Sequence, residues 1–220
     1  MKTIARSAGL VLALAAALPR PGLAQDSRLD RLAPDARALV APIIDSAGAA
    51  GLPAEPLVNR ALEGASKGAA APLIATAVRR LAADLGRSRE ALGPAAGTAD
   101  LTAAADALRA GASPAVLQRL RDALGSRRLA VPLGVTADLT ARGVPADTAA
   151  TLVITLARSV EDAQLLALQR DVERDIALGA PPLAAAAGRL GAADALNVSS
   201  PRTDAGSPTG SSAPPVRRKP

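Results

Sequence analysis

The sequence lacks several residue types on which much of protein chemistry depends. Its 220 residues include no cysteine, no histidine and no aromatic residue. Without thiolate or imidazole ligands, ordinary zinc, iron–sulfur and haem sites are excluded, as are Ser-His and Cys-His nucleophile pairs. There is also no ring on which a base or a sugar can stack. We therefore assign no catalytic, cofactor-binding or metal-ligating residue from the sequence, and we expect no cofactor.

Positive charge is in excess, but it lies at the two ends of the chain. The formal net charge is +6, from 26 basic and 20 acidic residues. Three basic residues stand in the first 24 residues, and four stand against one acid from Val198 onward, so the body from Gln25 to Asn197 is balanced. A nucleic-acid-binding protein carries its positive charge on the folded surface. We therefore expect no nucleic-acid partner.

Residues 1–24 have the three parts of a secretory signal peptide. Two basic residues precede an apolar run over Ala8–Leu18, and small residues end the segment at Ala24. This pattern predicts cleavage between Ala24 and Gln25, and hence a periplasmic or secreted protein. The run is shorter than the roughly 20 apolar residues that span a bilayer. Charged residues and glycines interrupt every later apolar run, so we expect no integral membrane segment after cleavage.

The body, residues 25–197, has the pattern of an all-α domain. Apolar residues recur with helical spacing, and no period-two alternation of β-branched or aromatic residues is present. The clearest stripes are Ile74, Ala77, Val78, Leu81 and Leu85; Val116, Leu117, Leu120 and Leu124; Ala149, Leu152, Val153 and Leu156; and Leu165, Leu168, Val172 and Ile176. We expect a compact array of about nine or ten short helices, as helical hairpins or an orthogonal bundle.

Capping residues predict where several helices begin and end. Ser113-Pro114 and Thr98 are expected N-caps. Glycines are expected just past helix ends at Gly86, Gly111, Gly125 and Gly179. A glycine, an apolar residue and a nearby proline also recur at 51–53, 111–114, 143–145 and 179–181, at spacings too uneven for an established repeat family.

The chain changes composition from Val198 to Pro220. Proline, serine, glycine and threonine dominate, and the segment ends in Arg217-Arg218-Lys219. Such a segment buries too little apolar surface to offset its ordering entropy, so a disordered tail is predicted. Its basic end could make a weak contact with an anionic surface.

Two polar clusters are candidates for chemistry. Asp171 and Asp175 stand one helical turn apart and could face one hard cation. Ion pairs of Arg170 with Glu173 and of Asp171 with Arg174 are the simpler expectation. Lys67 is the one lysine of the body and follows Ser66, but adjacent helical residues point apart, so a helix C-terminal cation is the better interpretation.

The segment from Gly51 to Lys67-Gly68, with Pro53, Pro56 and Glu63, resembles uncharacterised exported Ala-rich α-helical proteins of high-GC bacteria. The resemblance covers a tenth to a third of the chain and implies export and a helical fold. No assigned activity comes with it.

These observations favour a non-enzymatic envelope protein-binding or structural module with an envelope protein as its partner. Any interface would consist of Leu/Ala grooves rimmed by arginine, since the aromatic hot-spot residues are absent. A carboxylate-dependent hydrolase or lyase is one alternative, and a small-molecule or lipid carrier is another. The oligomeric state is left open.

Overall fold

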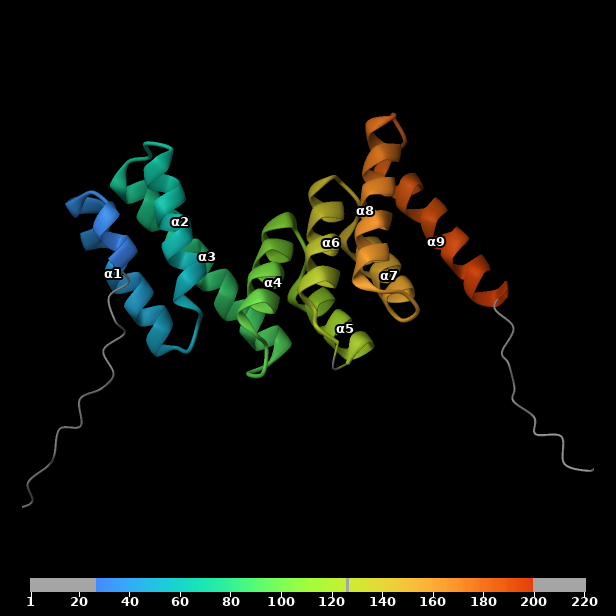
Figure 1. The fold of residues 1–220 in the computed structure, drawn as a ribbon, viewed down its shortest axis with the longest axis horizontal. Coiled ribbons are helices and arrows are strands. Elements are labelled where there is room, and N and C mark those ends of the chain that lie inside the picture. Colours follow the sequence, from blue (N-terminus) through green and yellow to red (C-terminus); the bar gives the residue numbers. More distant parts are fainter. Residues whose placement is uncertain (1–26, 126, 200–220) are drawn as a thin grey trace, which may run out of the picture. The chain divides into compact units, whose positions relative to one another are not determined.

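The computed structural model describes residues 27–125 and 127–199, and the expected all-α fold is confirmed within them (Figure 1). These residues form nine α-helices and one short 3-10 helix, with no strand. The predicted signal peptide lies outside the described residues, as does the predicted tail apart from its first two residues. The elements are η1 (Ser27–Arg31), α1 (Pro34–Ala49), α2 (Ala54–Ser66), α3 (Ala71–Leu92), α4 (Thr98–Ala110), α5 (Pro114–Leu124), α6 (Ala130–Ala141), α7 (Ala146–Ala157), α8 (Asp162–Ala177) and α9 (Pro182–Ser199).

The chain divides into two compact units, Met1–Gly86 and Arg87–Pro220, with the boundary inside α3. In the first unit, α1 contacts α2, and both contact η1. The expected stripe on α3 is buried at Ile74, Val78, Leu81 and Leu85. Helices α2 and α3 approach closely because Gly64 has no side chain: a Cβ there would lie 3.0 Å from Cγ1 of Ile74.

The second unit contains three successive helix–turn–helix pairs: α4–α5, α6–α7 and α8–α9. The first helices of the pairs contact one another in order, α4 with α6 and α6 with α8. The second helices do the same, α5 with α7 and α7 with α9. Each pair therefore packs on its neighbour in two layers, which is the arrangement of stacked helical-repeat proteins. Between the layers lies one apolar core that includes Leu117, Leu133, Leu139, Leu152 and Leu165.

One turn geometry joins the two helices of every pair. Gly111, Gly143 and Gly179 all have positive φ, a conformation that side chains disfavour. At Gly143 the amide donates to the Thr140 carbonyl at 2.9 Å, and the next amide, of Val144, donates to the Leu139 carbonyl at 3.1 Å. This is a Schellman motif. The same pair of bonds occurs at Gly111 and Gly179. The glycine-containing segments at 111–114, 143–145 and 179–181 therefore form equivalent turns.

Polar contacts join neighbouring pairs at their ends. The Arg127 guanidinium, in the loop after α5, donates to the carbonyls of Ala157 and Val160 and pairs with the Asp162 carboxylate at the start of α8. In α4, the Asp100 carboxylate accepts the Leu129 amide at 3.0 Å, at the start of α6.

Two predicted helix boundaries are wrong. Thr98 is the first residue of α4 rather than its cap, and the N-cap is Gly97. Gly86 does not follow a helix end, because α3 continues through it to Leu92. A glycine inside a helix costs only about 1 kcal/mol, which the burial of Ala91 and Leu92 can offset. The Ser113 cap is confirmed, since its Oγ accepts the Val116 amide at 3.3 Å.

Candidate functional site

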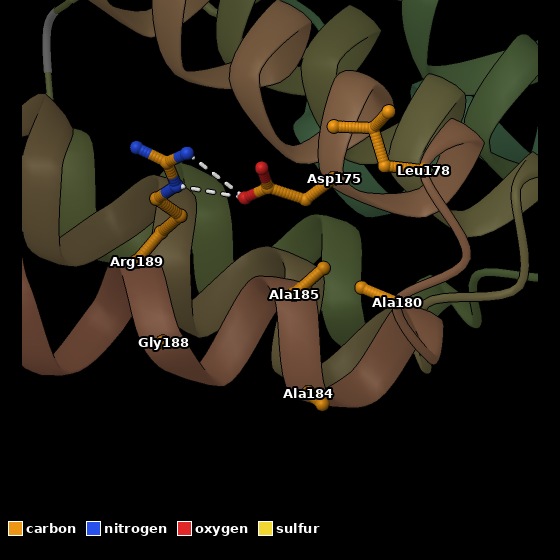
Figure 2. Close-up of a pocket in the computed structure, with 7 residues that line it drawn as sticks. All are labelled: Asp175, Leu178, Ala180, Ala184, Ala185, Gly188 and Arg189. Atoms are coloured by element: carbon orange, nitrogen blue, oxygen red, sulfur yellow. Dashed lines mark hydrogen bonds and ion pairs between the residues drawn. The ribbon is translucent and has the colours of Figure 1, made fainter.

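The two acidic residues proposed to face one cation do converge on a single positive group. That group is the Arg189 guanidinium of α9 (Figure 2). Asp175 Oδ2 accepts from Arg189 Nη2 at 2.8 Å and from Nε at 3.1 Å, and Asp171 Oδ2 lies 3.6 Å from Nη1. The carboxylates of α8 therefore hold α9 by an ion pair, in line with the simpler expectation that this cluster forms ion pairs.

The remaining charges of this cluster also form ion pairs. Arg174 pairs with Asp171 at 2.9 Å, as expected. The expected pair of Arg170 with Glu173 is not present, because Glu173 Oε1 accepts from Arg142 Nε at 2.8 Å and from the Gln169 amide at 2.9 Å. Sequence spacing within one helix could not reveal Arg142, which belongs to the preceding pair.

Lys67 occupies the position predicted for it at the end of α2. Its Nζ lies 2.5 Å from Glu63 Oε1, and Arg60 pairs with the other carboxylate oxygen at 2.9 Å. The hydrogen bond from Lys67, with that from Arg60, lowers the pKa of Glu63 below its ordinary value. Ser66 Oγ donates to the Glu63 carbonyl at 2.9 Å. The serine and the lysine thus serve their own helix and do not form a nucleophile pair.

A groove of about 540 Å³ opens between the end of α8 and the first half of α9. Asp175 and Arg189 form its polar end, as Figure 2 shows, and the other lining residues are aliphatic or glycine. They are Leu178, Ala180, Ala184, Ala185 and Gly188. Leu178 is 80% exposed. The groove can therefore accept an apolar group without breaking an ion pair.

The outward side of α9 is the feature that the sequence analysis missed. Ala185 and Ala186 are buried, and Arg189 and Leu190 are partly covered. As far as Gly191, the last residue of α9 whose side chain is described, the residues on the opposite side are all exposed, and none carries a polar side chain. They are Leu183, Ala184, Ala187, Gly188 and Gly191, called the α9 face below. Leu183 alone is 52% exposed. Leu183, Ala187 and Gly191 stand at i, i+4 and i+8, and none of them is charged. This spacing was the signal in the sequence for an apolar helix face.

The described helices contain neither an acidic cluster suited to a metal ion nor a membrane-spanning segment. No group of three or more acidic residues could hold a metal ion in the part of the chain that the structure describes. In the same residues, every buried side-chain nitrogen or oxygen has a hydrogen-bond partner. None of the described helices is long and apolar enough to cross a membrane.

Comparison with known proteins gives no relative. No family model, no curated protein and no solved structure matches this chain. Function must therefore be argued from the α9 face, the groove and the stacked helix pairs themselves.

Proposed function

We propose that this protein is an exported, non-enzymatic module that binds an apolar helical segment of a partner protein on the α9 face. The observation that carries the proposal is that this exposed face has no polar side chain. A helix on a protein surface normally directs charged or polar residues outward, whereas a helix that is apolar all round is buried. Export rests on the predicted signal peptide of residues 1–24.

Other helices of the same unit show what an uncovered helix looks like. The exposed side of α5 carries Gln118, Arg119 and Asp122, and that of α8 carries Arg170 and Arg174. These residues are compatible with water and need no partner. The difference is therefore specific to α9, the last helix of the stack.

The groove extends the α9 face toward α8 and suits the same kind of ligand. Leu178 and Ala184 supply aliphatic surface, and Asp175 and Arg189 neutralise each other at its end. Interfaces gain most of their energy from a few buried anchors, commonly aromatic ones. Because this chain has only aliphatic anchors, we expect moderate affinity and an aliphatic rather than an aromatic partner surface.

The carboxylate-dependent hydrolase or lyase is less well supported. Such a mechanism needs two carboxyl groups in one pocket with pKa values driven apart. Beside the groove, Asp171 and Asp175 are instead both bound to Arg189. An ion-paired carboxylate that holds two helices together is poorly suited to accept or donate a substrate proton.

A crosslinked pull-down with surface variants tests the binding function. Tagged mature protein from Gln25 to Pro220 is recovered from envelope extract of the organism that makes it, beside Leu183→Lys and a matched control, Leu73→Lys. Leu73 is an exposed leucine of α3 in the first unit. We expect a salt-stable partner with wild type and Leu73→Lys that is lost with Leu183→Lys. The proposal would be overturned if Leu183→Lys retained the partner or if folded wild type captured none. It would also be overturned if the partner were lost only on removal of the residues from Val198 onward.

A second candidate, the small-molecule or lipid carrier, is favoured by a groove in the first unit. It has a volume of about 480 Å³, within the range of about 300–1,000 Å³ typical of ligand pockets. Its walls are aliphatic apart from Ser46, and Arg79 at its edge has no ion pair among the described residues. The lining residues are Pro42, Ile43, Ser46, Ala47, Ala50, Leu52, Arg79, Ala82 and Ala83.

An aliphatic groove beside one cation suits a single-chain aliphatic carboxylate. Calorimetric titration with dodecanoate should detect binding that Arg79→Gln weakens about tenfold and Arg80→Gln leaves unchanged. Arg80 is the control because it is exposed and adjacent but does not line the groove. Equal binding by the two variants would exclude this ligand from the groove.

A further inference from the structure

We propose that the partner on the α9 face is a second copy of this chain, with the two α9 helices packed antiparallel about a twofold axis at Ala187. This inference rests on the proposed function, because it names the occupant of the same face. It specifies which residues of the two α9 helices lie opposite each other, so each of these contacts can be tested separately.

The chain that follows α9 is not a suitable cover. From Ser200 to Pro220 the apolar residues other than proline and glycine are Ala205, Ala213 and Val216. They are few, and they stand in a segment of proline, serine, glycine and charged residues. Such a segment has too little apolar surface to replace water along a helix face. This segment is therefore not the occupant that we propose.

The α9 face is complementary to itself. In an antiparallel pair centred on Ala187, residues equidistant from position 187 lie opposite each other, so Leu183 of one copy meets Gly191 of the other. The largest side chain of the face thus lies against a position with no side chain, and Ala187 lies against its own copy. A Cβ added at Gly188 or Gly191 would contact nothing within 4 Å, so this space is open in the single chain. Small residues at a helix contact allow the axes to approach closely.

The distribution of charge also allows one α9 face to pack on a second α9 face. A twofold interface places each residue near its own copy, so any charge on the axis would face an equal charge. The α9 face has none. Among the described side chains of α9 the one charge, Arg189, is turned back to Asp175 and Asp171 of its own chain. Asp194, three residues beyond Gly191, is far from the axis and in this register lies opposite position 180, so it does not face its own copy. Two α9 faces can therefore meet without electrostatic repulsion.

The contact is short, so the dimer should be weak. A stripe from Leu183 to Gly191, with part of the groove, places the interface at or below the small end of specific interfaces, about 1,200 Å² in total. We expect a dissociation constant of about 10⁻⁵ to 10⁻⁴ M.

The absence of cysteine allows a direct test of the register. Ala187→Cys introduces the only thiol of the chain, and under mild oxidation it should give a disulfide-linked dimer in most of the protein. Thr151→Cys, on the exposed side of α7, is the matched control and should crosslink at least tenfold more slowly. Equal crosslinking rates for the two variants would overturn the proposed axis.

Sedimentation velocity on the cysteine-free protein tests the same contact without a crosslink. Leu183→Lys should abolish the dimer, and Leu183→Lys with Gly191→Glu should restore it, because each lysine would then face a glutamate of the other copy. Circular dichroism confirms that the variants are folded. A double variant that stays monomeric while wild type dimerises would overturn the antiparallel register. If wild-type protein is monomeric at a concentration about ten times the expected dissociation constant, the proposed self-association is wrong.

These results separate the inference from the proposed function. If the purified protein does not self-associate, yet the pull-down recovers a different protein that Leu183→Lys loses, then the second copy is the wrong occupant and the binding face stands. If neither contact depends on Leu183, both proposals fail.

Discussion

Arg127 should contribute more to the stability of the second unit than any exposed ion pair. Its guanidinium binds the carbonyl of Ala157 at the end of α7, the carbonyl of Val160 in the following loop, and the carboxylate of Asp162 at the start of α8. The Arg127 side chain is only 25% exposed. Arg127→Met keeps most of the packing of the aliphatic stem and removes all three interactions.

The expected loss follows from those contacts. Hydrogen bonds to charged groups contribute about 1.5–3 kcal/mol each, but they are not additive, and part of this site is exposed to solvent. We therefore expect Arg127→Met to lower the free energy of unfolding by about 2–3 kcal/mol. For a domain of this size, that corresponds to a fall in Tm of about 4–12 °C.

Thermal and urea unfolding followed by far-UV circular dichroism measure this loss, since the chain has no tryptophan or tyrosine for fluorescence. Arg127→Lys keeps the charge but not the planar fork of donors, so it should recover less than half of the loss. Arg119→Met is the control: Arg119 also joins two helix pairs, through Asp147 at 3.1 Å, but both side chains are exposed. It should cost about 1 kcal/mol or less. Similar losses for Arg127→Met and Arg119→Met would refute the reasoning.

Three further changes test local features of the fold. Gly143→Ala should cost about 1–2 kcal/mol in urea unfolding, because φ is +92° there and the new Cβ would lie 3.4 Å from Cγ of Pro182; no loss would show that the turn adapts. Ser113→Ala should cost about 1 kcal/mol by removing the helix cap, and Ser113→Asp should not. The bond from Lys67 lowers the pKa of Glu63, so this carboxylate stabilises α2 above its ordinary value near 4.5 and the effect is lost as pH falls through the lowered pKa. The urea midpoint of Glu63→Gln should therefore depend less on pH than that of wild type between about pH 7 and pH 3, and parallel profiles would contradict this.

Helical periodicity predicted the fold well because burial follows it closely. Val116, Leu117 and Leu120 are all buried, as one stripe on α5 requires. Boundaries were less predictable. A glycine such as Gly86 is compatible with both a helix end and a helix interior, and only the burial of Ala91 and Leu92 beyond it decides between them.

The candidate site was only partly predictable. Sequence spacing brought Asp171 and Asp175 to one side of a helix but could not say which cation lies opposite them. Arg189, which occupies that place, stands 14 residues after Asp175, and Arg142 reaches Glu173 from another helix pair. Contacts of this kind depend on how the pairs stack, and nothing in the local sequence encodes that.

The position of α9 in the stack explains why binding should be sought there. In a protein built from stacked helix pairs, each pair is covered by its neighbours, and the terminal pair normally has a polar outer side. Helix α6 is covered by α4 on one side and α8 on the other, whereas the main contacts of α9 within the described part of the chain are with α7 and α8. Its outer side from Leu183 to Gly191 nevertheless has the composition of an internal contact. The stack therefore ends in a surface suited to one more helix, and a second α9 has both the shape and the absence of charge to fill it.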